Sequence, residues 1–147
     1  MSGIICAIRG GPDSQPTISQ SIALAQETGQ IIYFLYVVNL DFLSHTATSR
    51  TRIIQREMQE MGEFILLTAQ AQALDKGANA EIVLRQGQVS TEIIELCREI
   101  NANYVVLGRP RGKTEANIFT HDRLKQFTQY IEQESHAKVI LAQVNSE

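Results

Sequence analysis

The stretch RQGQVSTEIIELCREINANYVVLG, residues 85–108, holds a turn, an amphipathic helix and a buried strand in succession. Gly87 predicts the turn, and apolar residues that recur every three or four positions predict a helix that begins at Ser90. The run at 103–108 is apolar through its centre, which is typical of a strand buried on both faces. A strand reached through a helix pairs in parallel with an earlier strand, so this stretch indicates a parallel sheet. The helix is expected to direct inward Ile93, Ile94, Cys97 and Ile100.

The same alternation continues in both directions along the chain, where apolar β-branched runs are separated by segments with helical spacing. Because crossovers between parallel strands are right-handed, this order predicts a doubly wound α/β fold with a five-stranded, mainly parallel sheet and helices on both faces. We expect a single domain over residues 1–147. The predicted strands are 4–8, 31–38, 80–85, 103–108 and 138–144, one predicted helix is 117–136, and the apolar side of the longest helix holds Ile53, Ile54, Met58, Met61, Ile65, Leu66 and Ala69.

Local signals mark the ends of several elements. Gly29 and Gly77 are expected to end the helices before them, because glycine readily adopts the positive φ of a helix C-terminus. Asp13 and Ser14 are expected to cap the first helix, since their side-chain oxygens can accept hydrogen bonds from free backbone N–H groups. Arg85 ends a predicted strand and is expected to face solvent.

Composition excludes several classes of protein. The formal net charge is −3 over 147 residues, so the chain as a whole has no electrostatic footprint for nucleic acid. No apolar run is long enough to span a bilayer, and the first residues do not have the pattern of a secretory signal, so we expect no membrane association. The two cysteines, Cys6 and Cys97, lie in apolar settings without metal-ligand spacing, which favours buried thiols and a cytoplasmic location.

No set of residues predicts an enzyme. His45, His121 and His136 are scattered and have no partner at metal-ligand spacing, so neither a metal site nor a metal-dependent reaction is expected. The Gly-x-Ser-x-Gly turn of serine hydrolases is missing. Residues 112–114, Gly-Lys-Thr, match only the end of the phosphate loop of P-loop ATPases.

Open parallel sheets bind ligands beyond the carboxyl ends of the strands, where the strand order reverses. The strands at 4–8 and 103–108 should flank that point, which places the segments 9–14 and 108–114 there. The second segment, GRPRGKT, has two interpretations. It is an anion site in which Arg9 and Arg109 face each other across the gap between the strands, or it is a solvated turn whose cations keep the protein in solution.

Four segments together resemble the universal stress protein family across nearly the whole chain. They are CAIRGGPDS at 6–14, YVVN at 36–39, the stretch 85–108, which is the most specific, and KVILAQV at 138–144. The resemblance implies a Rossmann-like, homodimeric domain that binds an adenine nucleotide such as ATP or AMP, or takes part in signalling, without a defined reaction. By the family pattern the ligand-binding residues would be Ile8, Arg9, Gly10, Val37, Gly108, Arg109, Gly112, Lys113 and Thr114.

The chain departs from the family pattern at three points. Arg9 stands where the family has an aspartate that contacts the nucleoside, and a guanidinium group cannot accept a hydrogen bond from a ribose hydroxyl. Gly108 and Gly112 are separated by three residues instead of two, and Pro110 removes one backbone donor. The distal Gly-Ser of the phosphate loop is missing, because no glycine lies between Lys113 and Lys138.

The resemblance, taken together with these departures, implies a small cytoplasmic stress-response or regulatory domain that binds an adenine nucleotide or another phosphate-bearing anion where the strand order reverses. The alternative is a dimeric protein-interaction module of the same fold that has lost nucleotide binding. In either case we expect a homodimer through residues 138–144, because an unpaired apolar edge strand invites a second copy. The polar connection at 39–50 is expected to be mobile and to lie over the site.

Overall fold

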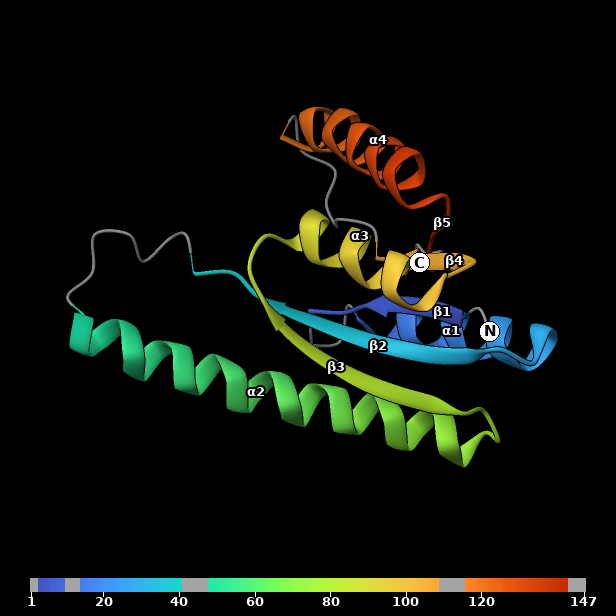
Figure 1. The fold of residues 1–147 in the computed structure, drawn as a ribbon, viewed down its shortest axis with the longest axis horizontal. Coiled ribbons are helices and arrows are strands. Elements are labelled where there is room, and N and C mark those ends of the chain that lie inside the picture. The colour runs from blue at the N-terminus through green and yellow to red at the C-terminus, as the bar shows by residue number, and fades with distance from the viewer. Residues whose placement is uncertain (1–2, 10–13, 41–47, 109–115, 143–147) are drawn as a thin grey trace.

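Strands and helices alternate along the whole structure (Figure 1). The computed structural model describes residues 3–9, 14–40, 48–108 and 116–142. Predicted boundaries agree with the observed ones within a few residues; for example, the third helix begins one residue before Ser90. The elements are β1 (Gly3–Ala7), α1 (Gln15–Thr28), β2 (Ile31–Val38), α2 (Thr48–Asp75), β3 (Ala80–Gln86), α3 (Val89–Ile100), β4 (Tyr104–Leu107), α4 (Ala116–Ser135) and β5 (Lys138–Leu141).

The five strands form one sheet in the order β3-β2-β1-β4-β5, and every pair of neighbours is parallel. The predicted doubly wound α/β fold is therefore confirmed. β1 lies in the centre, and its register with β4 pairs Cys6 with Val106. The chain runs outward to β2 and β3 on one side of β1 and to β4 and β5 on the other. The strand order thus reverses between β1 and β4, as predicted.

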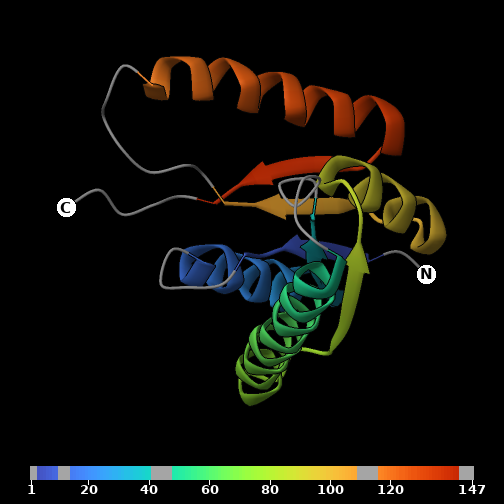
Figure 2. The ribbon, with the colours of Figure 1, turned by 90° about the vertical axis from the view of Figure 1, so that its left-hand side faces the viewer.

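Helices cover both faces of the sheet. Figure 2 shows α1 and α2 side by side, with α3 on the other side of the strands. Successive residues of a strand point to opposite faces, so neighbouring residues enter different cores. Ile4 and Phe34 pack in the core beneath α1 and α2, whereas Ile5 and Leu35 pack in the core beneath α3 and α4. All four of these side chains are fully buried.

The C-terminal end of α1 agrees with the prediction from the sequence, whereas its N-terminal end differs in one respect. Gly29 has a φ of 73° and donates its backbone N–H to the carbonyl oxygen of Ala25 at 2.7 Å, so it ends α1 as predicted. Ser14 occupies the N-cap position, but its side chain makes no capping hydrogen bond to the described part of the helix. Ser14 therefore has the predicted position but not the expected side-chain hydrogen bond, and Asp13 lies outside the described residues.

The long helix α2 turns a different set of residues inward than predicted. Leu66 and Ala69 are fully buried, as expected, but Ile53 is 60% exposed and Met61 is 59% exposed. The prediction is wrong for these two residues because a helix rotates by about 100° per residue. Ile53 and Met61 each precede a residue of the buried face by one position, which carries their side chains to the outer surface.

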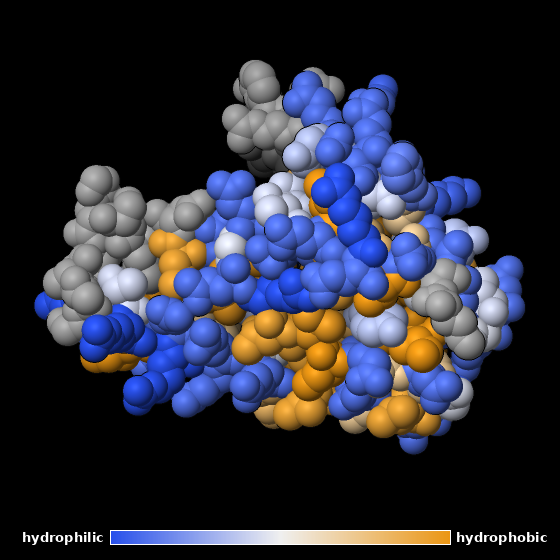
Figure 3. Space-filling model, viewed as in Figure 1, coloured by the Kyte–Doolittle hydropathy of each residue, from blue (hydrophilic) through white to orange (hydrophobic). Residues whose placement is uncertain are grey.

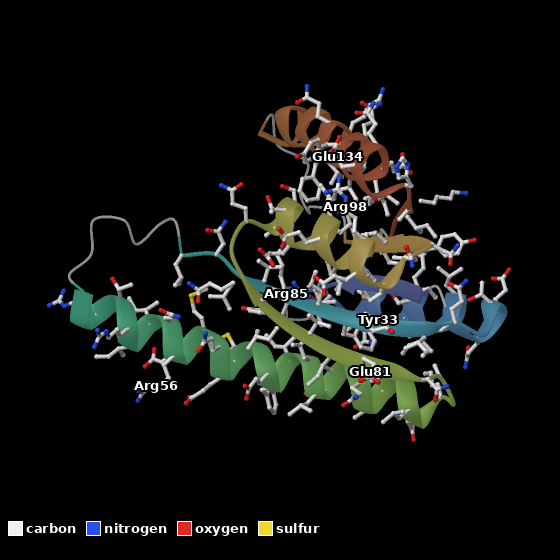
Figure 4. All side chains as sticks on the ribbon, viewed as in Figure 1. Tyr33, Arg56, Glu81, Arg85, Arg98 and Glu134 are labelled. Atoms are coloured by element: carbon white, nitrogen blue, oxygen red, sulfur yellow. The ribbon has the colours of Figure 1, made fainter. Side chains whose placement is uncertain are left out.

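The expectation that Arg85 faces solvent is correct only in part. Figure 4 shows Arg85 on β3 projecting toward α3, and its side chain is only 26% exposed. Its Nη2 donates to both carboxylate oxygens of Glu99 at 3.0 Å, and its Nη1 lies 3.8 Å from a carboxylate oxygen of Glu92. The hydrogen bond from Arg85 lowers the pKa of Glu99. Arg85 therefore connects β3 to α3.

Candidate functional site

A cavity of about 410 Å³ opens at the carboxyl ends of the central strands. Seven of its lining residues come from the strand ends and the residues just after them, and three come from helices. The strand-end residues are Ala7, Ile8 and Arg9 at β1, Leu35 and Val37 in β2, and Leu107 and Gly108 at β4; the helix residues are Val89 of α3 and Leu124 and Phe127 of α4.

The cavity exists because the connections leave neighbouring strands toward opposite faces. The Ile8 N–H donates to the Leu35 carbonyl at 2.9 Å, which extends the pairing of β1 and β2 to the rim of the cavity. Beyond this point the chain passes from β1 to α1 on one face, and from β4 to α4 on the other. A crevice between diverging connections is the usual ligand site of an open parallel sheet.

Four of the predicted ligand-binding residues meet at this cavity: Ile8, Arg9, Val37 and Gly108. Ile8 is 4% exposed and forms part of the wall, whereas Arg9 is exposed. The other five, Gly10, Arg109, Gly112, Lys113 and Thr114, lie outside the described residues. The predicted pair of Arg9 and Arg109, and residues 41–47 of the connection expected to cover the site, fall outside them too.

Gly108 has a packing role in addition to its place in the cavity wall. A Cβ at this position would lie 2.9 Å from Oγ1 of Thr17 on α1, closer than real Cβ contacts. Thr17 is 2% exposed and cannot move into solvent without opening the core. Glycine at 108 therefore lets α1 pack closely against the end of β4.

Sequence reasoning did not predict the helix residues of the cavity. Leu124 and Phe127 are three positions apart, so they share one face of α4, and Phe127 packs against the core beneath α3 and α4. Their spacing indicates an inward face, but only the packing of α4 brings that face to the ends of β1 and β4. Val89 is the first residue of α3 and reaches the cavity from the turn after β3.

The walls determine which ligands the cavity can accept. Apart from Gly108 and Arg9, every described lining residue has an apolar side chain, and Arg9 is the only charged one among them. Such a site can bury a flat apolar group and place an anionic group beside the guanidinium. The described lining contains no side-chain acceptor for a ribose hydroxyl.

The two cysteines are not arranged for nucleophilic chemistry. Burial raises the pKa of Cys6 to about 12 and that of Cys97 to about 11, so both stay protonated thiols at neutral pH. The Cys6 thiol donates a weak hydrogen bond to the carbonyl oxygen of Thr17 at 3.8 Å. Within the described ranges, no group of three or more histidine, cysteine or acidic residues could hold a metal ion. None of the described helices is long and apolar enough to cross a membrane.

The fold is shared with solved structures of low sequence identity. A universal stress family protein from Burkholderia pseudomallei is 19% identical with a TM-score of 0.72, and the match covers 97% of this chain and 96% of that one. The Archaeoglobus fulgidus universal stress protein in complex with dAMP is 14% identical, with a TM-score of 0.64 and coverage of 97% and 98%. An Arabidopsis thaliana family member with AMP bound is 13% identical, with a TM-score of 0.62 and coverage of 99% and 94%.

Sequence comparison leads to the same family. No curated protein matches the chain. Residues 1–144, nearly the full length, match the model of the universal stress protein family. The chain therefore belongs to the universal stress protein family.

Proposed function

We propose that this protein is a small, non-catalytic regulatory domain that binds an adenine nucleotide or another phosphate-bearing anion. The observation that carries the proposal is the cavity at the ends of β1, β2 and β4, where Ile8, Arg9, Val37 and Gly108 meet. A purine base would lie against the apolar walls near Val37. Arg9, exposed at the β1 end of the lining, would neutralise a phosphate.

Two further observations support this proposal. The family members from Archaeoglobus fulgidus and Arabidopsis thaliana were solved with dAMP and AMP, respectively. The cavity lies where open parallel sheets bind their ligands. Since both cysteines are free and buried in the fold, a cytoplasmic location is part of the proposal.

Thermal unfolding with AMP, ATP and inorganic phosphate tests ligand binding. A ligand at a hundredfold excess over its Kd stabilises the native state by about 2.7 kcal/mol, which raises the Tm by about 5–10 °C for a chain of this size. Val37→Trp fills the cavity and should abolish the response to AMP and ATP. Arg9→Ala should weaken the response to all three ligands.

Lys76→Ala is the matched control for the charge change, because Lys76 is an exposed cation at the end of α2 that leads into β3, away from the cavity. It should respond to each ligand as the wild type does. A nucleotide response that survives both Val37→Trp and Arg9→Ala would place the ligand elsewhere and contradict the proposal.

We also propose a homodimer through residues 138–144. β5 is an edge strand of the sheet, and Val139, Ile140 and Leu141 are partly exposed. One feature opposes simple edge pairing: the Val139 N–H already donates to Oε2 of Glu132 on α4 at 3.0 Å. Pairing with a second β5 would require Glu132 to release the Val139 N–H. Glu132→Ala should therefore tighten the dimer, as measured by sedimentation equilibrium. An unchanged or weaker dimer would contradict this interface.

The alternative function, an interaction module without a small ligand, is favoured by the lack of a ribose acceptor in the described cavity lining. The same ligand panel distinguishes the two functions. A stable dimer whose Tm responds to none of the three ligands would support the interaction module, whereas a response that Val37→Trp abolishes would exclude it.

A further inference from the structure

The outer surface of α2 carries a stripe of large apolar side chains. At about 100° of rotation per residue they lie on one side of the helix, opposite the side that packs on β2 and β3. Figure 3 shows apolar side chains gathered over the part of the molecule where Figure 1 places α2 and β3. The stripe residues and their exposed fractions are Ile53 60%, Met61 59%, Phe64 72%, Leu67 52% and Leu74 55%.

We propose that α2 pairs with α2 of a second copy of this chain, antiparallel, about a twofold axis at Phe64. The order of the stripe is nearly the same when read from either end. Met61 and Leu67 lie three positions before and after Phe64, and Ile53 and Leu74 lie eleven before and ten after it. A twofold axis at Phe64 would therefore bring apolar residues of the two copies to the same levels along the helices, and a twofold interface is the commonest kind between identical chains.

In such a pair, residues equally distant from Phe64 on its two sides lie at the same level along the two helices. Phe64 meets Phe64 of the second copy, and Ile53 and Leu74 lie at nearly the same level on equal flanks. Met61 and Leu67 lie at the same level on opposite flanks of the pair. The 28 residues of α2 span about 42 Å, which is long enough to hold all of these levels. The large apolar residues of the stripe then all lie along the seam between the two copies.

The two glutamates within the stripe also fit the pairing. Glu57 lies seven positions before Phe64 and Ala71 lies seven after it, so the long glutamate would face a small residue. Glu60 and Thr68 lie four positions before and after Phe64, so they share a level along the pair but stand on opposite flanks. All four residues are exposed. The apolar part of each glutamate side chain can therefore lie along the partner helix while its carboxylate reaches solvent.

Charges at the two ends of the stripe are complementary as well. Arg50 and Asp75 are exposed and lie on the same flank of α2 by helical rotation. A twofold axis brings the same flank of each α2 helix together. Arg50 lies fourteen positions before Phe64 and Asp75 lies eleven after it, so Arg50 of one copy would be displaced from Asp75 of the other by about 4.5 Å along the helix axis. An arginine side chain spans this offset, and the twofold axis repeats the ion pair at the other end. A partner of unrelated sequence would not need this symmetry.

The α2 stripe is separate from the edge proposed for the β5 dimer. α2 packs on β2 and β3, and β3 is at the opposite edge of the sheet from β5. A copy held at α2 therefore leaves β5 accessible. The α2 pairing does not depend on the proposed nucleotide site or on the β5 dimer.

Cross-linking through introduced cysteines tests the symmetry directly. With helix axes 8–10 Å apart and Cα atoms about 2.3 Å from each axis, two copies of residue 64 would be roughly 5 Å apart, within the Cα separation of a disulfide. Phe64→Cys should therefore give a covalent dimer with oxidised glutathione. Leu74→Cys is the matched control, because its two copies would lie about 30 Å apart along the axis. The natural cysteines are buried and should not interfere.

Charge reversal gives a second, independent test by sedimentation equilibrium of the full chain. Arg50→Asp and Asp75→Arg should each weaken the assembly several-fold, and the double variant should restore it. Phe64→Asp should halve the mass of the wild-type assembly, whereas Arg52→Glu, on an exposed part of α2 outside the stripe, should not. Equal cross-linking of residues 64 and 74, or an unchanged mass for Phe64→Asp, would overturn the proposal.

Discussion

Replacing each of two adjacent leucines of α2 by alanine tests how this helix is oriented. Leu66 is fully buried in the core beneath α1 and α2, whereas Leu67 is 52% exposed. The two substitutions remove the same atoms from neighbouring positions of one helix. Any difference in the free energy of unfolding therefore reports on burial and not on helix propensity.

The expected loss for Leu66→Ala has two parts. Removing about three buried carbon groups costs roughly 2.4 kcal/mol at 0.8 kcal/mol each, and the cavity left in a close-packed core raises the total to about 3–4 kcal/mol. Leu67 is already half in water and leaves no cavity, so Leu67→Ala should cost less than about 1 kcal/mol.

The measurement is urea unfolding followed by far-UV circular dichroism, since the chain has no tryptophan. The protein should be dilute, so that association through α2 does not add to the stability of the variants with Leu67 intact. Leu66→Ala should lower the urea midpoint strongly with an unchanged m value. Equal losses for the two variants, or a larger loss for Leu67→Ala, would refute the orientation of α2 and with it the exposed stripe.

Three further predictions concern thiols, an ion pair and a glycine. Neither thiol of the native protein should react quickly with an Ellman-type reagent, because both are buried. Burial raises the pKa of Cys6 to about 12 and that of Cys97 to about 11. The stability that the two protonated thiols contribute should therefore be fully present below pH 9.0, and urea titrations at alkaline pH should show it falling as the pH rises toward these pKa values. Glu99→Gln should lower the urea midpoint at neutral pH, because the ionised carboxylate pairs with Arg85 and its pKa is lowered. This stabilisation requires the ionised carboxylate, so the difference from wild type should shrink as the pH falls below about 4.3. Gly108→Ala should lower the Tm by a few degrees because the added Cβ meets a buried hydroxyl on α1, and a Tm equal to wild type would show that α1 can shift without cost.

The sequence by itself determined the order of elements and the parallel sheet. Runs such as 31–38 and 103–108 are apolar on both faces, and only helical segments separate them, so local periodicity and the handedness of crossovers leave few other folds. The same reasoning placed the ends of β1 and β4 together. Arg9 and Gly108, which stand at these strand ends, could therefore be assigned to one site, whereas Ile8 and Val37 were assigned to it only through the resemblance to the family.

Only the tertiary structure decided which side of each helix is buried and what completes the cavity. Apolar residues occur on both sides of α2, and the packing of this helix on β2 and β3 selects Leu66 for the core and leaves Met61 in solvent. Phe127 reaches the cavity because α4 packs beside α3, a contact between residues distant in sequence. Arg85 is partly covered because Glu99 lies opposite it across such a contact. Periodicity describes one element at a time, whereas these features depend on where two elements meet.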